Sequence, residues 1–250
     1  MILIPQNIIC TYKLKYFGYR IEAMDIDLLP IELVRQHPKS DDCLRACGLM
    51  ILKYFDDSVS KSEVWKRLHV YKKHSGLWGG YLTDLGMFVA KKDYKSVIYH
   101  HDWHWWDEET VNTSEKGEEL TKALKILKKE KREWAHKKLI AKEIKYLNSG
   151  GKLIFQKPGF EIINYYLQKK IPVILSVRGE DIYKNPKEDF NHALVIAGKS
   201  GKNYIVKDSY QGLEKIETER LMVAWIRAGG WMMVIEPTAA KKVKQEKLMF

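Results

Sequence analysis

The chain has 250 residues, 45% of them hydrophobic and 12% aromatic, a composition that excludes a disordered protein and allows a large core. No apolar run approaches the ~18 residues that a membrane span requires, and three cysteines are too few for a disulfide framework. The start has no basic lead-in and no small-residue cleavage site, so we expect no signal peptide and a cytoplasmic location.

The formal net charge is +11, and it is unevenly distributed. Residues 115–147 contain eleven Lys or Arg against six Glu, and residues 241–247 contain four Lys against one Glu. Such a surface could bind an acidic partner. The sequence contains no helix-turn-helix or Gly-rich RNA-binding motif, which argues against nucleic-acid binding.

The first half of the chain is predicted to be mainly helical. Residues 2–21 indicate a strand or an extended arm. Hydrophobic periodicity then predicts helices over about 42–55, 60–68 and 83–92, and a strand over 96–100. Ser40, Asp41 and Asp42 are competent N-caps for the helix over 42–55, and Ser60 with Glu63 forms a capping box for the next one.

The lysine-rich segment 115–147 predicts one long amphipathic helix or a helical hairpin. Its stripe of Leu120, Leu124 and Leu127 should pack on the domain, with the lysines in water and away from any active-site cleft. A short helix is expected over 160–169, and another over 218–228. Four β-branched runs are expected to be strands, over 171–177, 193–197, 204–206 and 231–235.

The order of helices first and mainly antiparallel strands later predicts an α+β fold. The simplest division is a single domain over 1–250 with a lysine-rich helical insertion at about 107–150.

Cys43 is the candidate nucleophile. It falls in the first turn of the helix over 42–55, where unpaired backbone N–H groups and the helix dipole favour a thiolate. A lone helical cysteine is more often a small core residue, and we expect Cys47 to be one. With no second cysteine pair in the chain, a closed zinc site of thiolates is excluded.

His192 is the candidate base. It begins a strand whose other residues are apolar, and the next strand ends at Asp208. Two antiparallel strands with a short connection would bring Asp208 close enough to accept the imidazole N–H and fix its tautomer. Each residue alone has a structural interpretation, but their joint order favours a Cys-His-Asp site.

These residues lie in motifs that resemble a known family. Gln36 with Asp42-Cys43-x-x-Ala46-Cys47, and the run from Asn191 to Gly198, resemble the cysteine peptidases that cut double-glycine leader peptides, together with their stand-alone papain-like relatives. The segment from Tyr204 to Asp208 looks like the aspartate strand of that family, and Trp78 with Thr83-Asp84-Leu85 is similar to a segment between the two motifs.

The resemblance implies a papain-like fold, in which a helical lobe carries the nucleophile and an antiparallel sheet carries the histidine and aspartate. It also implies that Gln36 donates its amide to the oxyanion together with the Cys43 N–H. The family commonly has Gly after the nucleophile, whereas this chain has Leu44, and the Gln36-to-Cys43 spacing is one residue longer than expected. In such a cleft, Gly79 and Gly80, with Trp78, would bind the substrate backbone.

The remaining motif is an aromatic and histidine-rich run over 99–107. His100 and His104 could share a helix face, but no matching ligand occurs elsewhere, so we predict neither a metal nor a cofactor. Three tryptophans in this run are better suited to covering a cleft or contacting a partner.

The sequence therefore predicts a thiol-dependent hydrolase that cleaves a peptide, or a related amide in a protein, through a Cys43 thioester. The alternatives are an acyltransferase that uses the same residues and a non-catalytic binding protein that retains the fold.

Overall fold

The structure is a computed structural model that describes residues 24–55, 58–72, 79–101, 108–113, 117–131 and 134–241. The arm predicted over 2–21, together with Trp78, lies outside these ranges. So does most of the aromatic run, including His104. No helix within the described ranges is long and apolar enough to cross a membrane.

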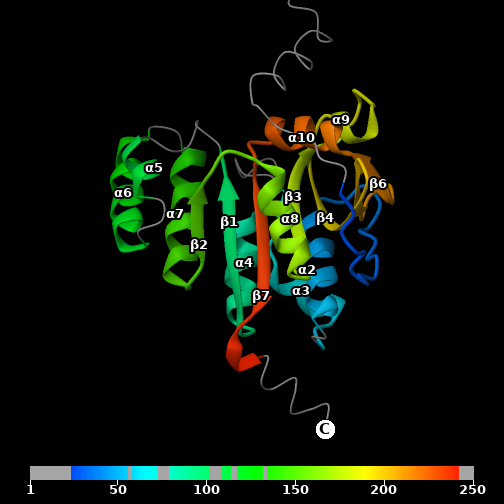
Figure 1. Ribbon diagram of the computed structural model, residues 1–250. Helices are drawn as coiled ribbons and strands as arrows, with labels where there is room; N and C mark the ends of the chain where they lie inside the picture. Colours follow the sequence, from blue (N-terminus) through cyan, green and yellow to red (C-terminus); the bar gives the residue numbers. More distant parts are fainter. Residues whose placement is uncertain are drawn as a thin grey trace, which may run out of the picture.

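The fold combines helices with a seven-stranded sheet (Figure 1). The strands are β1 (Tyr94–His100), β2 (Lys152–Phe155), β3 (Val173–Arg178), β4 (Asn191–Ser200), β5 (Asn203–Lys207), β6 (Lys215–Glu217) and β7 (Met232–Pro237). Their order across the sheet is β2-β1-β7-β3-β4-β5-β6. Every neighbouring pair is antiparallel except β1 and β2, which run parallel. The predicted α+β class is confirmed.

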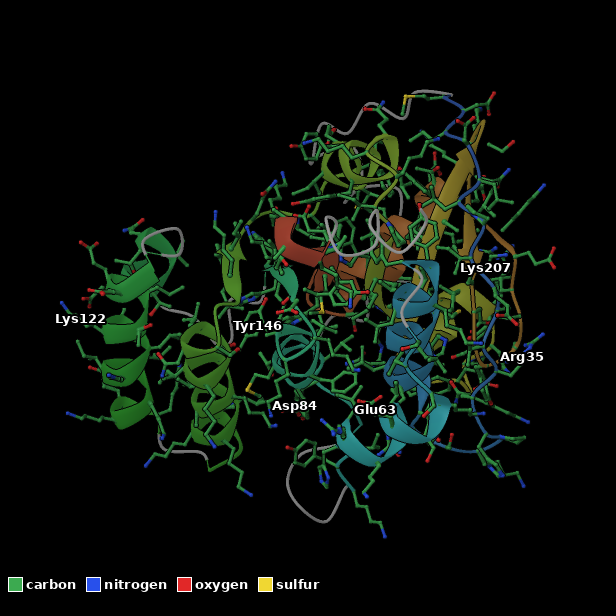
Figure 2. The ribbon with its side chains drawn as sticks, turned by 90° about the horizontal axis from the view of Figure 1, so that it is seen from below. Arg35, Glu63, Asp84, Lys122, Tyr146 and Lys207 are labelled. Atoms are coloured by element: carbon green, nitrogen blue, oxygen red, sulfur yellow. The ribbon has the colours of Figure 1, made fainter. Side chains whose placement is uncertain are left out.

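Helices cover both faces of the sheet. They are α2 (Cys43–Tyr54), α3 (Lys61–Arg67), α4 (Leu82–Ala90), α5 (Glu108–Asn112), α6 (Gly117–Glu130), α7 (Trp134–Asn148), α8 (Phe160–Gln168), α9 (Gly179–Tyr183) and α10 (Thr218–Arg227). Helices α2 and α4 pack on one face and α8 on the other, while α5, α6 and α7 extend beyond the β2 edge (Figures 1 and 2). The helical lobe with the candidate nucleophile thus lies against the strands that carry the candidate base.

The core joins α2 and α4 to the central strands. Most of α2 is buried, and strands β3, β4 and β7 contribute long apolar runs because they are covered on both faces. Ser60 accepts a hydrogen bond from the Glu63 N–H at 3.1 Å, as expected for the predicted capping box of α3.

The lysine-rich segment forms a helical hairpin of α6 and α7. Leu120, Leu124 and Leu127 are buried, as their spacing predicts. Figure 2 shows Lys122 on the outer side of α6 and Tyr146 between α7 and α4. The Tyr146 ring leaves no room for a side chain at Gly86, where a Cβ atom would lie 2.2 Å from it. Glycine at this position therefore lets α7 dock closely on α4.

Candidate active site

Cys43 is the first residue of α2 and is partly exposed. Asp42 occupies the N-cap position, but its side chain makes no capping hydrogen bond. It binds Arg45 at 2.8 Å and the indole N–H of Trp65 at 3.1 Å. The Asp42 side chain therefore does not cap the first-turn N–H groups of α2, and the positive end of the helix dipole lies at Cys43.

Cys47 lies one turn further along α2 and is completely buried. Burial raises the pKa of its thiol well above the ordinary value, and the nearby Cys43 and Asp208 add to this effect. A neutral, inaccessible thiol is a poor nucleophile. Cys43 is therefore the better placed of the two.

His192 on β4 and Asp208 just after β5 are in direct contact. The Nε2 atom of His192 lies 2.8 Å from Oδ1 of Asp208, and the two side chains are 2% and 0% exposed. Burial lowers the pKa of His192, but hydrogen bonds with Asp208 and Cys43 outweigh burial and raise it to about 9. Because Nε2 faces Asp208, Nδ1 is the ring nitrogen left for Cys43. The three predicted residues are thus brought together.

The Asp208 carboxylate accepts further hydrogen bonds. Its additional donors are Tyr183 Oη at 3.1 Å, Tyr210 N at 2.9 Å, Gln211 N at 3.1 Å and Leu213 N at 3.1 Å. Burial raises the pKa of Asp208, but the bond from His192 and the backbone N–H groups outweigh burial and lower it. The carboxylate is therefore held ionised and in one orientation.

Sequence reasoning missed Tyr183, at the end of α9. Burial and the adjacent Asp208 carboxylate raise its pKa, so its hydroxyl remains a donor. Its ring lies 6.1 Å from that of His192, between centroids, and Phe190 and Tyr210 approach the imidazole to 6.2 and 6.1 Å. No motif marked these three aromatic residues, because only the fold gathers them.

Gln36 lies beside the site through two contacts with Ser209. The Ser209 hydroxyl donates to Gln36 Oε1 at 2.9 Å, and the Gln36 backbone N–H donates to the Ser209 carbonyl at 3.1 Å. The Gln36 Nε2 group donates one hydrogen to the Ser40 carbonyl at 2.7 Å. Gln36 is not among the residues that line the cleft beside Cys43. An oxyanion role would have to use its second amide hydrogen.

Gly79 and Gly80 both line this cleft. Gly79 has φ 76° and is paired with Tyr71 in an isolated bridge. At Gly80 a Cβ atom would lie 3.0 Å from the Leu44 side chain. Leu44 thus packs into space that Gly80 leaves open.

The cleft has a volume of about 720 Å³ and contains Cys43 and His192. Its walls come from the start of α4, the β3 and β4 ends, the end of α10 and, unexpectedly, α7. Leu139 and Glu143 of α7 line it, whereas none of the described lysines of segment 115–147 does. The sequence could not show this, because it depends on how the hairpin docks.

His100, at the end of β1, lies in the core. It is completely buried and stacks on Trp231 with ring centroids 4.0 Å apart. Burial, and secondarily His101, lower its pKa to about 3. Within the ranges that the structure describes, no group of three or more His, Cys, Asp or Glu is arranged to hold a metal ion.

The site and fold together define a class of protein, an α+β fold in which a cysteine at a helix start faces a His-Asp pair. No family profile and no curated protein matches the chain. The solved structures that are similar include two at 14% identity. One is a double glycine motif protease from an AMS/PCAT transporter in complex with its leader peptide, with TM-score 0.46, covering 88% of this chain and 100% of that one. The other is a putative C39-like peptidase from Bacillus anthracis, with TM-score 0.47, covering 85% and 98%. Both are of the kind that the Cys43 and His192 motifs resemble.

Proposed function

We propose that the chain is a thiol-dependent hydrolase that cleaves a peptide or related amide bond, with Cys43 as nucleophile, His192 as base and Asp208 as the residue that orients His192. One observation carries the proposal: Cys43 and Asp208 both bond to the His192 ring, inside a cleft large enough for a peptide segment.

The reaction follows from these contacts. His192 takes the Cys43 proton, and the thiolate attacks the scissile carbonyl carbon. The tetrahedral oxyanion collapses to a thioester as the imidazolium gives its proton to the leaving amine. Water, deprotonated by His192, then releases the acid and restores the thiol. Asp208 stabilises the imidazolium in both halves.

The oxyanion donors in this proposal are the Cys43 backbone N–H and the free hydrogen of the Gln36 amide. The position of Cys43 at the start of α2 supports the first donor. The contacts of Gln36 with Ser209 support a fixed amide close to the site. Gly79 and Gly80, with Trp78, would bind the substrate backbone.

Transfer of the acyl group to an amine would use the same residues, because only the attacking group differs. A binding protein would need the cleft but not the Cys43 thiolate. For the protein itself we propose a single domain over 1–250 and a cytoplasmic location, where thiols stay reduced.

The test is incubation with a peptide library, with and without an added amine, followed by mass spectrometry. We expect hydrolysis products, and loss of activity in Cys43→Ala and His192→Ala. Asp208→Asn should keep a measurable residual rate, because it loses orientation but not the nucleophile. Cys47→Ala is the matched control and should stay active. An active Cys43→Ala protein would refute the assignment, and amide products with the added amine would identify a transferase.

A further inference from the structure

Helix α6 lies at the edge of the protein, beyond strand β2 (Figure 1). It packs on α5 and α7, and Leu120, Leu124 and Leu127 are buried in this packing. Because one side of the helix holds these leucines, the opposite side faces solvent along the length of α6. That outer face belongs to none of the contacts that form the candidate active site.

Three lysines form a stripe along the outer face of α6. Lys122, Lys125 and Lys129 are spaced at i, i+3 and i+7, so they share one side of the helix, and all three are exposed. The stripe covers about two helical turns, or roughly 10 Å. Figure 2 shows Lys122 on the outer side of the helix. Three cations are therefore presented in a row to the solvent.

These three lysines, the α6 stripe, have no ion-pair partner among the residues that the structure describes. Glu118 stands four residues before Lys122, the favourable arrangement for an ion pair within a helix, yet the two do not pair. The next helix behaves differently, since Lys142 of α7 pairs with Asp84 at 2.6 Å. The charge of the α6 stripe is thus available to a partner.

An apolar side chain lies beside the stripe. Ile126 is 46% exposed, with Lys122 four residues before it and Lys129 three residues after it. A single exposed apolar side chain alone would need no explanation. Next to unpaired lysines, however, it gives the same surface both charge and an apolar contact, which is the mixture found in protein interfaces.

The surface fits an acidic protein helix better than other anions. A helix lying along α6 can present carboxylates on one face at a matching spacing, with an apolar side chain against Ile126. A phosphate backbone supplies charge but no such apolar contact. A membrane would take up a broad apolar face, and the apolar face of α6 is buried. The ends of the chain do not match by charge, since residues 1–23 and 242–250 each contain three Lys or Arg against one Glu.

We propose that the outer face of α6 is a docking surface for an acidic helix of a partner protein. The α6 stripe pairs with carboxylates on one face of that helix, and an apolar side chain of the partner covers Ile126. None of these four α6 residues lines the cleft that contains Cys43. The docking surface therefore goes beyond the proposed function and does not depend on it.

The test measures binding of a designed probe to the full-length protein. The probe is a fluorescently labelled, Ala-rich helical peptide with blocked ends, and it carries three Glu and one Leu on one face. A scrambled peptide of the same composition spreads the three Glu around the helix and should bind about five-fold more weakly. Replacing Lys122, Lys125 and Lys129 together by Gln should weaken the probe about ten-fold, because each exposed ion pair contributes about a factor of two. Ile126→Gln should weaken it about three-fold.

The matched control removes the same charge from other faces of the protein. It replaces three exposed lysines by Gln and should change the affinity of the probe less than two-fold: Lys66, Lys202 and Lys215. Equal weakening in the control and in the stripe variant would overturn the proposal, because the probe would then sense only net charge. Equal binding of the scrambled peptide would overturn it for the same reason.

Two further measurements complete the test. Phosphatidylcholine vesicles with about 30% phosphatidylserine, or oligothymidylate, might compete for the stripe. If either bound more tightly than the probe and lost that binding in the stripe variant, the surface would belong to a membrane or a nucleic acid, and the proposal would be wrong. Replacing all three stripe lysines by Glu should restore binding to a peptide in which Lys replaces each Glu, and no such recovery would refute the pairing. Binding by a protein that cleaves no peptide would leave this inference intact while refuting the proposed chemistry.

Discussion

Replacement of Tyr183 by Phe tests how the His-Asp pair is tuned. The change keeps the ring but removes the hydroxyl that donates to Asp208 at 3.1 Å. The Asp208 carboxylate would keep its bonds from His192 and three backbone N–H groups. With one donor fewer it becomes a stronger base, and it should hold the His192 proton more tightly.

The size of the expected pKa shift follows from the energy of one hydrogen bond to a charged group, which is about 1.5–3 kcal/mol. Only part of this energy should appear as a change in the pKa of His192, because four other donors also bind the carboxylate. A transfer of about 1 kcal/mol would raise the pKa of His192 from about 9 by a little under one unit.

The assay is the rate of alkylation at Cys43 by iodoacetamide between pH 5 and about 10, with the modified residue located by mass spectrometry. The alkaline limb of the profile should move to higher pH in Tyr183→Phe. Tyr204→Phe is the matched control, since it removes a hydroxyl that donates to Asn164 at 2.8 Å, away from the pair. It should lower stability without moving the profile.

Two results would refute the reasoning. One is an alkaline limb that stays in place or moves to lower pH in Tyr183→Phe. The other is an equal movement in Tyr204→Phe, because the shift would then reflect general destabilisation.

Three further predictions concern stability and the lysine-rich surface. The pKa of His192 is raised to about 9, so its stabilising effect is complete below about pH 6.5 and is lost as the pH rises through 9. Urea titrations should therefore show a lower free energy of unfolding at pH 10 than at pH 6, with a smaller difference in Asp208→Asn. Gly86→Ala should lower the melting temperature, because overpacking against Tyr146 costs about 1–3 kcal/mol and exceeds the helix-propensity gain; a more stable variant would contradict the packing. Replacing Lys128, Lys129 and Lys131 by Gln should weaken the binding of polyglutamate and reduce the salt dependence of that binding, without slowing peptide cleavage. Equal loss of binding and of cleavage would place these lysines in the active site.

Much of the fold is encoded in local sequence patterns. The helix that begins at Cys43 has a clear helical periodicity, and the strand that contains His192 is a long apolar run, so their type and place could be predicted. Short elements could not. Strand β6 and helix α9 have three and five residues, and β2 pairs in parallel with a strand about fifty residues earlier in the chain. Such elements form because of tertiary contacts.

The residues of the candidate site also fall into those that the sequence could predict and those that it could not. Cys43, His192 and Asp208 were predictable because their residue types carry a known chemistry and follow recognisable elements. Tyr183 and Glu143 were not, because neither a lone tyrosine nor a glutamate among lysines is unusual in sequence. Their positions depend on where α9 and α7 dock.

The orientation of the Asp42 side chain has a mechanical consequence. Capping by an N-terminal aspartate typically stabilises a helix by about 1 kcal/mol, and α2 forgoes it. The carboxylate instead binds Trp65 of α3, and Arg45 of α2 donates to the Leu68 carbonyl at the end of α3 at 2.7 Å. Helices α2 and α3 are thereby clamped together at the end that holds Cys43. A substitution at Trp65, which is not among the cleft-lining residues, would remove the Asp42 half of that clamp and loosen the end of α2 that positions the Cys43 sulfur.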